Sequence, residues 1–128
     1  MPQKNNRPVF LDLARIRLPI SALISIAHRI AGVVLFFSIP FAIYLLDLSL
    51  GSQLGYQRVQ GLLDHVTIKL LVIVIFWALA HHVYAGVRVL LIDLGIGVDR
   101  DEARRSAWVI VVGSLVSLVM IAGILLWL

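Results

Sequence analysis

Cysteine is absent from the 128 residues. Without thiolates the chain cannot ligate an iron–sulfur cluster through sulfur, build a cysteine zinc site, attach a c-type haem covalently or form disulfides. Charge is also scarce, since 14% of the residues are charged against about a quarter in an average soluble domain. Hydrophobic residues make up 61% of the chain. The sequence therefore predicts a bilayer protein with no water-soluble domain of its own.

Charge-free apolar runs mark the expected membrane spans. Crossing about 30 Å of hydrocarbon takes roughly 20 helical residues. Pro40 lies inside the first run and is expected to kink its helix, which a membrane helix tolerates when neighbours satisfy the freed carbonyl. We expect an all-α membrane protein in which residues 1–128 form a single transmembrane domain, with spanning helices at 21–47, 67–93 and 106–128.

The cations indicate orientation. The net charge of +4 arises from residues between the apolar runs, which favours a topology signal over a nucleic-acid surface. Before and within the first run lie Lys4, Arg7, Arg15, Arg17 and Arg29. The second loop and its flanks carry Arg88, Arg100, Arg104 and Arg105, whereas the first loop has only Arg58 and Lys69. The positive-inside rule then predicts a cytoplasmic N-terminus and an outer C-terminus.

The first residues carry no targeting signal that the sequence reveals. Residues 1–7 are polar and lack the apolar stretch and cleavage site of a secretory signal, and no mitochondrial presequence is evident. The expected location is a bacterial inner membrane, with several passes. Gly113 and Ser117 form a small-xxx-small pair that permits close helix packing. Their partner is expected to be another helix of this chain or a second subunit.

Helix 67–93 carries ionisable side chains at a depth where they are costly and often functional. His82 lies eleven residues from Asp93, or roughly 16 Å along a helix, which places it near the middle of the bilayer. Ala78, His82, Gly86 and Asp93 share one helix face, while His81 points about 100° away, on the face of Arg88. Small residues one turn from His82 leave room for a flat group, and a neutral imidazole is a good axial haem ligand.

Two simpler roles for His82 stay open on this evidence. The imidazole can bond a neighbouring helix while Gly86 serves packing alone, or it can belong to a proton relay. His65, near the outer end of the same helix, is interpreted as an interfacial residue.

A second polar cluster lies near the start of helix 21–47. Ser25, Arg29 and Gly32 fall on one face, with His28 beside them. Arg29 can snorkel to headgroups and Ser25 can bond its own helix, which is the structural explanation. The functional alternative is a pocket for a polar head with an apolar tail, or charge-assisted bonds to haem propionates.

Several of these residues stand in a recognisable order. The runs are Arg7-Pro8-Val9-Phe10-Leu11-Asp12-Leu13, then Ser25-Ile26-Ala27-His28-Arg29, then His82-Val83-Tyr84-Ala85-Gly86-Val87-Arg88, and Asp93-Leu94-Gly95. In order, spacing and predicted topology the chain closely resembles the cytochrome b subunit of succinate dehydrogenase, a membrane anchor of respiratory complex II. The resemblance covers most of the chain.

The resemblance implies a function and a set of site residues. Subunits of that family pair with a second membrane anchor subunit, hold the flavoprotein and iron–sulfur subunits on the lipid bilayer, bind one haem b and complete a ubiquinone site. It implies His82 as the axial ligand of the haem iron, with Gly86 beside the cofactor. It implies Ser25 and Arg29 in the quinone pocket, and His28 and Arg29 at the haem propionates.

Three positions depart from the family pattern. Ala31 stands where Ser or Thr is usual, Val89 where His or Phe is usual, and Ile92 where an aromatic residue or Met is usual. None of them removes the expected ligand or the Ser25 and Arg29 pair.

The resulting expectation is electron transfer from succinate, through a partner's iron–sulfur cluster, to ubiquinone. Alone, the chain is not expected to be an enzyme, and it has no catalytic residue for succinate oxidation. The rival interpretations are a haemless structural anchor, a fumarate-reductase anchor and a small transporter subunit that uses His81, His82 and Arg88 as an ion path.

Overall fold

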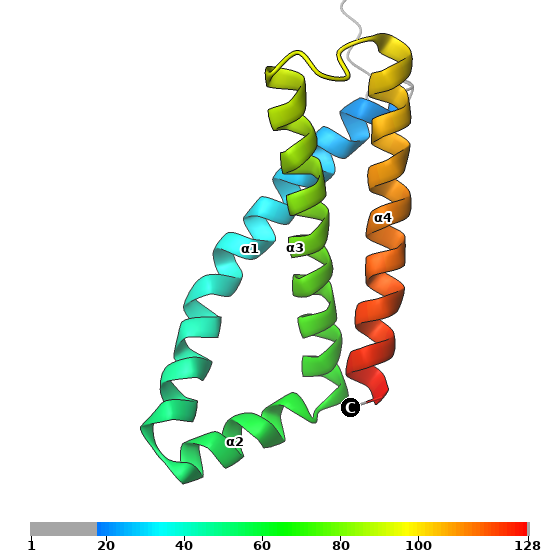
Figure 1. Ribbon diagram of the computed structural model, residues 1–128. Helices are drawn as coiled ribbons and strands as arrows, with labels where there is room; N and C mark the ends of the chain where they lie inside the picture. Colours follow the sequence, from blue (N-terminus) through cyan, green and yellow to red (C-terminus); the bar gives the residue numbers. More distant parts are fainter. Residues whose placement is uncertain (1–17, 128) are drawn as a thin grey trace, which may run out of the picture.

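The computed structural model describes residues 18–127, and four helices make up most of that part (Figure 1). In chain order they are α1 (Ile20–Gly51), α2 (Gln53–Leu63), α3 (Val66–Asp93) and α4 (Arg100–Trp127). No strand occurs between residues 18 and 127. Helices α1, α3 and α4 are long and apolar enough to span a membrane. The expected all-α membrane fold with three spans is confirmed.

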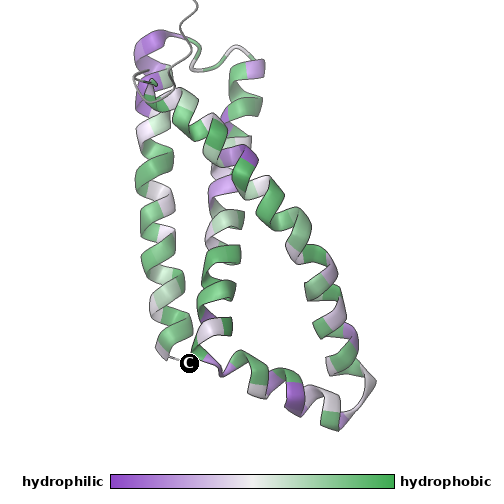
Figure 2. Cartoon of the chain, turned by 180° about the vertical axis from the view of Figure 1, so that it is seen from behind, coloured by the Kyte–Doolittle hydropathy of each residue, from purple (hydrophilic) through white to green (hydrophobic). Residues whose placement is uncertain are grey.

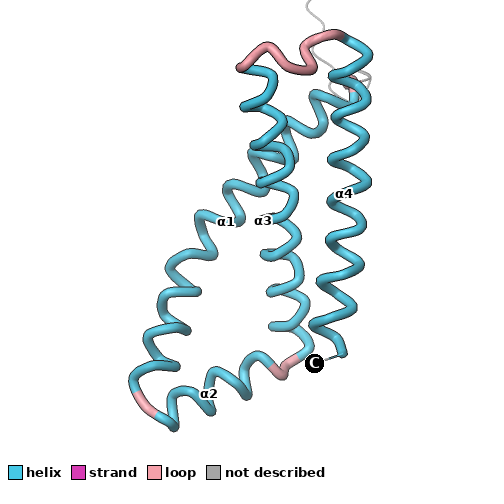
Figure 3. Tube along the Cα trace, viewed as in Figure 1, coloured by secondary structure: helices cyan, strands magenta, loops and turns pink. Residues whose placement is uncertain are grey.

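Short connections join the helices, and the three spanning helices alternate in direction along the chain, while α2 lies crosswise between α1 and α3 (Figure 3). The start of α1, the end of α3 and the start of α4 meet at one end of the bundle (Figure 1). We call it the N-terminal end. The run from Arg7 to Leu13, and the cations Lys4, Arg15 and Arg17, lie outside the described residues.

Two helices extend beyond their predicted ends. Helix α1 continues four residues past position 47, to Gly51, and α4 begins at Arg100 rather than at 106. The first turn of α4 holds Asp101 and Glu102. Carboxylates in the first turn interact favourably with the positive end of the helix dipole. Helix α4 therefore starts several residues ahead of its apolar run in the sequence.

Helix α2 is an additional helix that the hydropathy pattern does not reveal. Its eleven residues cover about 16 Å, too little to span a bilayer. The Ser52 hydroxyl caps it by accepting a hydrogen bond from the Gly55 amide at 3.0 Å. A Cβ on Gly55 would collide with the carbonyl oxygen of Leu48. Glycine at position 55 therefore lets α2 pack tightly against the C-terminal end of α1. Helix α2 lies across the bundle at the end opposite the N-terminal end (Figure 1).

The turn between α3 and α4 depends on two glycines with positive φ, Gly95 at 79° and Gly97 at 74°. The Gly95 amide donates to the Ile92 carbonyl and the Ile96 amide donates to the Leu91 carbonyl, each at 2.9 Å. This is a Schellman ending, in which a left-handed glycine satisfies the last helical carbonyls. It returns the chain toward α4 at the N-terminal end.

The tightest packing lies near the N-terminal end, where α1, α3 and α4 meet. Its buried residues are Ile24, Ala85, Ala107 and Ile110. Ala85 and Ala107 are 1% and 0% exposed, and their small side chains let the helices approach closely.

Beyond this contact α1 diverges from α3, and the part that contains Pro40 has exposed apolar side chains such as Phe36 and Phe37 (Figure 1). Hydrophilic residues gather mainly toward the helix ends, and hydrophilic bands also lie part-way along α1 and α3 where the two helices cross (Figure 2).

Candidate functional site

Two histidines face each other where α1 crosses α3. The ring centroids of His28 and His82 are 4.1 Å apart, with the rings tilted by 33°. Nδ1 of His82 lies 3.2 Å from the backbone carbonyl oxygen of His28. A carbonyl oxygen only accepts hydrogen bonds, so Nδ1 of His82 is the donor. The bond leaves Nε2 as the basic nitrogen of a neutral His82.

Glycines make this approach possible, and they do so reciprocally. A Cβ on Gly32 would lie 3.2 Å from Cε1 of His82, and a Cβ on Gly86 would lie 3.6 Å from Nε2 of His28. Each histidine therefore packs against the glycine that follows the other histidine by four residues, on an antiparallel helix. The structure places Gly32, rather than Gly86, directly against the His82 ring.

The geometry of His82 suits an axial haem ligand. A ligating histidine almost always donates its other ring N–H to a carboxylate, carbonyl or water, which fixes the tautomer and the ring plane. In this chain the His28 carbonyl accepts the hydrogen bond from the Nδ1–H of His82. Within residues 18–127 Nε2 of His82 has no hydrogen-bond partner, and the residue is partly exposed. The His82 ring is thus fixed through Nδ1, and Nε2 is the nitrogen that could bind a ligand.

The ring of His28 is placed differently. Its Nε2 is buried and has no hydrogen-bond partner among the described residues, and it lies on the Gly86 side of the contact. His28 therefore contacts His82 in two ways: its backbone carbonyl accepts a hydrogen bond from the His82 ring, and its own ring packs against that ring.

Ser25 and Arg29 lie one turn apart on α1, and both are exposed. Neither side chain makes a hydrogen bond to another residue of the described part. The simpler interpretation for Ser25, a bond back to its own helix, is therefore not what the structure has. Within residues 18–127, both the hydroxyl and the guanidinium are thus free to bind another group.

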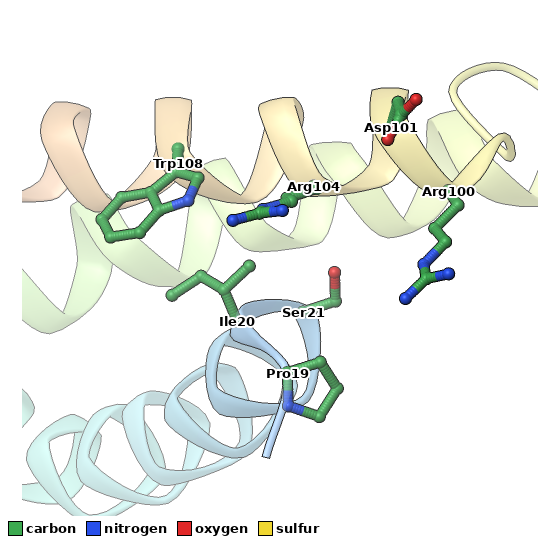
Figure 4. A pocket seen from close by; sticks show the side chains of 7 residues that line it. All are labelled: Pro19, Ile20, Ser21, Arg100, Asp101, Arg104 and Trp108. Carbon is green, nitrogen blue, oxygen red and sulfur yellow. The ribbon is translucent and has the colours of Figure 1, made fainter. Parts of the chain in front are cut away.

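A cavity near the N-terminal end of the bundle does not include these two residues. It measures about 570 Å³ and lies between the starts of α1 and α4. The guanidinium groups of Arg100 and Arg104 extend into it, opposite the Ser21 hydroxyl and beside Trp108 (Figure 4). Ser25 and Arg29 follow the cavity-lining Ser21 by about one and two helical turns and do not line this cavity.

His81 is turned away from this site, as its angular position predicts. It is 8% exposed, and its Nδ1 shares a 2.9 Å hydrogen bond with the Ser114 hydroxyl of α4. The Trp77 indole donates to the Ser114 carbonyl at 3.0 Å. Neither Trp77 nor Ser114 was identified from the sequence, because their contacts depend on the register between α3 and α4.

Arg88 also faces α4, and it joins all three spanning helices. Its Nε donates to the Ser106 hydroxyl at 3.0 Å, and one terminal nitrogen donates to the Ala103 carbonyl at 3.1 Å and to the Ser21 hydroxyl of α1 at 3.4 Å. The guanidinium is thus satisfied inside the chain.

The small-residue pair of α4 also has its partner here. The Tyr84 hydroxyl shares a 2.9 Å hydrogen bond with Ser117, and a Cβ on Gly113 would lie 3.5 Å from the Tyr84 ring. Of the two expected partners, the structure shows a helix of this chain.

Among residues 18–127 there is no group of three or more His, Cys, Asp or Glu side chains that could hold a metal ion. A metal ion held by His82 would therefore need its other ligands from outside this part of the chain.

Comparison with known proteins agrees with this architecture. The model of the succinate dehydrogenase/fumarate reductase transmembrane subunit family matches residues 3–121. A succinate dehydrogenase cytochrome b556 subunit of Coxiella burnetii is 39% identical over 122 residues, which cover 94% of this chain and 97% of that relative. Subunits of the same name are 30% identical in Rickettsia conorii, over 96% and 92% of the two chains, and 29% identical in Paracoccus denitrificans, over 91% and 90%. The chain belongs to the succinate dehydrogenase/fumarate reductase transmembrane subunit family.

Proposed function

We propose that this chain is the haem b-binding membrane anchor of a succinate:ubiquinone oxidoreductase. The observation that carries the proposal is the setting of His82, whose Nδ1 is bonded to the His28 carbonyl at 3.2 Å while Nε2 has no partner within the described residues. The relatives named as cytochrome b556 subunits support a haem of the b type.

The haem, when bound, would carry one electron at a time. His82 would hold it through Nε2 as one axial ligand, and a second membrane anchor subunit would supply the other. His82 is partly exposed within the described residues, which is compatible with contact to a second polypeptide. Arg29, exposed and one residue from His28, would pair with a propionate, since a guanidinium forms strong charge-assisted bonds to carboxylates.

Ser25 and Arg29 would form this chain's part of the ubiquinone site. The Ser25 hydroxyl would donate to a quinone carbonyl, and Arg29 would stabilise negative charge as it develops on the reduced oxygen. Both side chains are exposed on α1 near the N-terminal end of the bundle. In the proposed inner-membrane topology that end is cytoplasmic, where protons for quinone reduction are at hand.

The electrons would come from partner subunits. With no cysteine the chain cannot ligate an iron–sulfur cluster through sulfur, so it would receive electrons from an iron–sulfur subunit that the flavoprotein reduces. The relatives named for succinate dehydrogenase favour succinate oxidation over fumarate reduction. The relatives named as cytochrome b556 subunits favour a haem-binding anchor over a haemless one.

Purification of the native complex through a tag on this chain tests the proposal. We expect a flavoprotein, an iron–sulfur protein and a second hydrophobic chain to copurify, with haem b present and with succinate:ubiquinone reductase activity. A colourless complex that contains its partners would refute haem binding and leave a structural anchor. Absence of the flavoprotein would refute the assignment to succinate oxidation.

A further inference from the structure

Two consecutive histidines on α3 create a choice of ligand. His81 and His82 lie at the same depth, about 100° apart around the helix axis. A rotation of α3 by that angle would bring His81 to the angular position that His82 holds. The structure shows which contacts hold one setting: His82 faces the His28 carbonyl of α1, whereas His81 faces Ser114 of α4.

Ser114 is bonded through both of its polar groups. Its hydroxyl shares the 2.9 Å hydrogen bond with Nδ1 of His81, and its carbonyl accepts the Trp77 indole N–H at 3.0 Å. Trp77 and His81 are one helical turn apart on α3, so two donors or acceptors of one face meet a single residue. Ser114 and His81 are 3% and 8% exposed, and their bond is shielded from water.

The same face of α3 makes further polar contacts with α4. Tyr84 shares a hydrogen bond with Ser117, and Arg88 donates to Ser106. The residues at 77, 81, 84 and 88 follow helical spacing and form one stripe. This stripe, with Ser106, Ser114 and Ser117 of α4, is the α3–α4 polar contact.

Such a contact can fix helix rotation where apolar packing does not. Lipid is as apolar as Leu, so packing and interhelical hydrogen bonds, rather than a hydrophobic force, decide how membrane helices face each other. Small buried residues such as Ala85 and Ala107 allow close approach, but they tolerate more than one rotation. The directional hydrogen bonds at Ser114 can form at only one rotation of α3.

We propose that His81 and Ser114 are positioning residues, which hold the rotation of α3 so that His82 rather than His81 is presented to the haem. The inference rests on the proposed function. It assigns α4, which carries none of the predicted site residues, a part in setting the axial ligand.

The test compares the haem signal of complexes that carry His81→Leu, Ser114→Ala or His81→Asn. The electron paramagnetic resonance spectrum of the oxidised haem responds to the orientation of its axial imidazole planes. We expect His81→Leu and Ser114→Ala to shift or broaden the low-field feature and to change the reduction potential. His81→Asn places an amide where Nδ1 lies and should return both readouts toward wild type.

Two further variants complete the test. Ser49→Ala removes an exposed hydroxyl that bonds only its own helix, at Leu46, and should change nothing. The double variant His81→Leu/Ser114→Ala should shift the haem signal no more than the larger single variant, because both remove the same bond. If Ser114→Ala does not assemble, Trp77→Phe, which removes the other bond to Ser114, takes its place with the same expected direction.

The outcomes separate this inference from the proposed function. A wild-type complex without haem would overturn both. A second outcome would overturn the positioning role alone. In that outcome His82→Ala abolishes haem binding, but the spectra of His81→Leu and Ser114→Ala (or Trp77→Phe) are identical to wild type. An equal shift in His81→Asn and His81→Leu would also overturn it, since the hydrogen bond would not be the cause.

Discussion

Nδ1 of His82 on α3 is bonded to the backbone carbonyl oxygen of His28 on α1, at 3.2 Å. Since a backbone group makes this bond, no side-chain substitution of His28 removes it directly. What can change it is the distance between α1 and α3. The glycines at the crossing control that distance, and they provide the first prediction.

Gly32→Ala should disturb the haem. The added Cβ would lie 3.2 Å from Cε1 of His82, a contact so tight that the imidazole or the helix must move. We expect a shifted α band and haem retention reduced by about tenfold, the lower end of the range for lost support of a metal ligand. Haem per complex, measured during dialysis against apomyoglobin, is the readout.

The matched controls are glycines in less crowded places. Gly86→Ala meets His28 at an ordinary 3.6 Å, and Gly123→Ala on α4 meets nothing within 4 Å. Gly86→Ala should have a smaller effect than Gly32→Ala, and Gly123→Ala none on the haem. Equal haem loss from all three variants would contradict the packing argument.

Ser25→Ala and Arg29→Lys should impair ubiquinone reduction, and Ser25→Ala should do so with normal haem content. Ser25→Ala removes the expected hydrogen bond to the quinone and should raise KM. Arg29→Lys keeps a positive charge but loses the planar fork of donors, and should lower kcat. Steady-state rates with succinate and a short-chain ubiquinone give both constants.

Ser38→Ala is the control for the quinone prediction, because the Ser38 hydroxyl bonds the Leu35 carbonyl of its own helix. Unchanged kinetics in Ser25→Ala and in Arg29→Lys, with Ser38→Ala also normal, would show that the quinone site lies elsewhere.

Arg88→Leu should destabilise the bundle. The substitution removes three hydrogen bonds, to Ser106, Ala103 and Ser21, and bonds of a charged donor contribute about 1.5–3 kcal/mol each at most. We expect a lower Tm of the detergent-solubilised complex, with Arg88→Lys between Leu and wild type. Arg58→Leu, on the exposed face of α2, should leave Tm unchanged. An unaltered Tm in Arg88→Leu would mean that the three bonds add no net stability.

The absence of cysteine permits a direct test of orientation. Single cysteines at Val98, in the turn before α4, and at Gln57, on α2, lie at opposite ends of the bundle and are exposed. In intact spheroplasts an impermeant maleimide should label Gln57→Cys and spare Val98→Cys. Lysis should make both reactive. The reverse pattern would refute a cytoplasmic N-terminus.

The spans were predictable because the physics that defines them is local. A run without charge that is long enough to cross the bilayer can be read from sequence, and three such helices occur. Helix α2 was not predictable in this way, since it is short and polar and depends on the Ser52 cap and on contact with Leu48. The start of α4 was missed because charged residues between 100 and 105 suggest a loop.

The site was predictable as far as one helix determines it. Helical periodicity correctly separated the faces of His81 and His82. The pairing of His82 with Gly32, and of His28 with Gly86, requires the register between α1 and α3. The role of Ser114 requires the register between α3 and α4. Neither register is encoded in the spacing within a single helix.

The central claim is that Nε2 of His82 ligates haem iron. The most direct test is the dithionite-reduced minus oxidised spectrum of the complex purified with His82→Ala, beside wild type and His65→Ala, which alters an exposed histidine at the start of α3. We predict a sharp b-type α band in wild type and in His65→Ala, and its loss in His82→Ala while the partner subunits still copurify. An undiminished band in His82→Ala, with its partners present, would contradict the account.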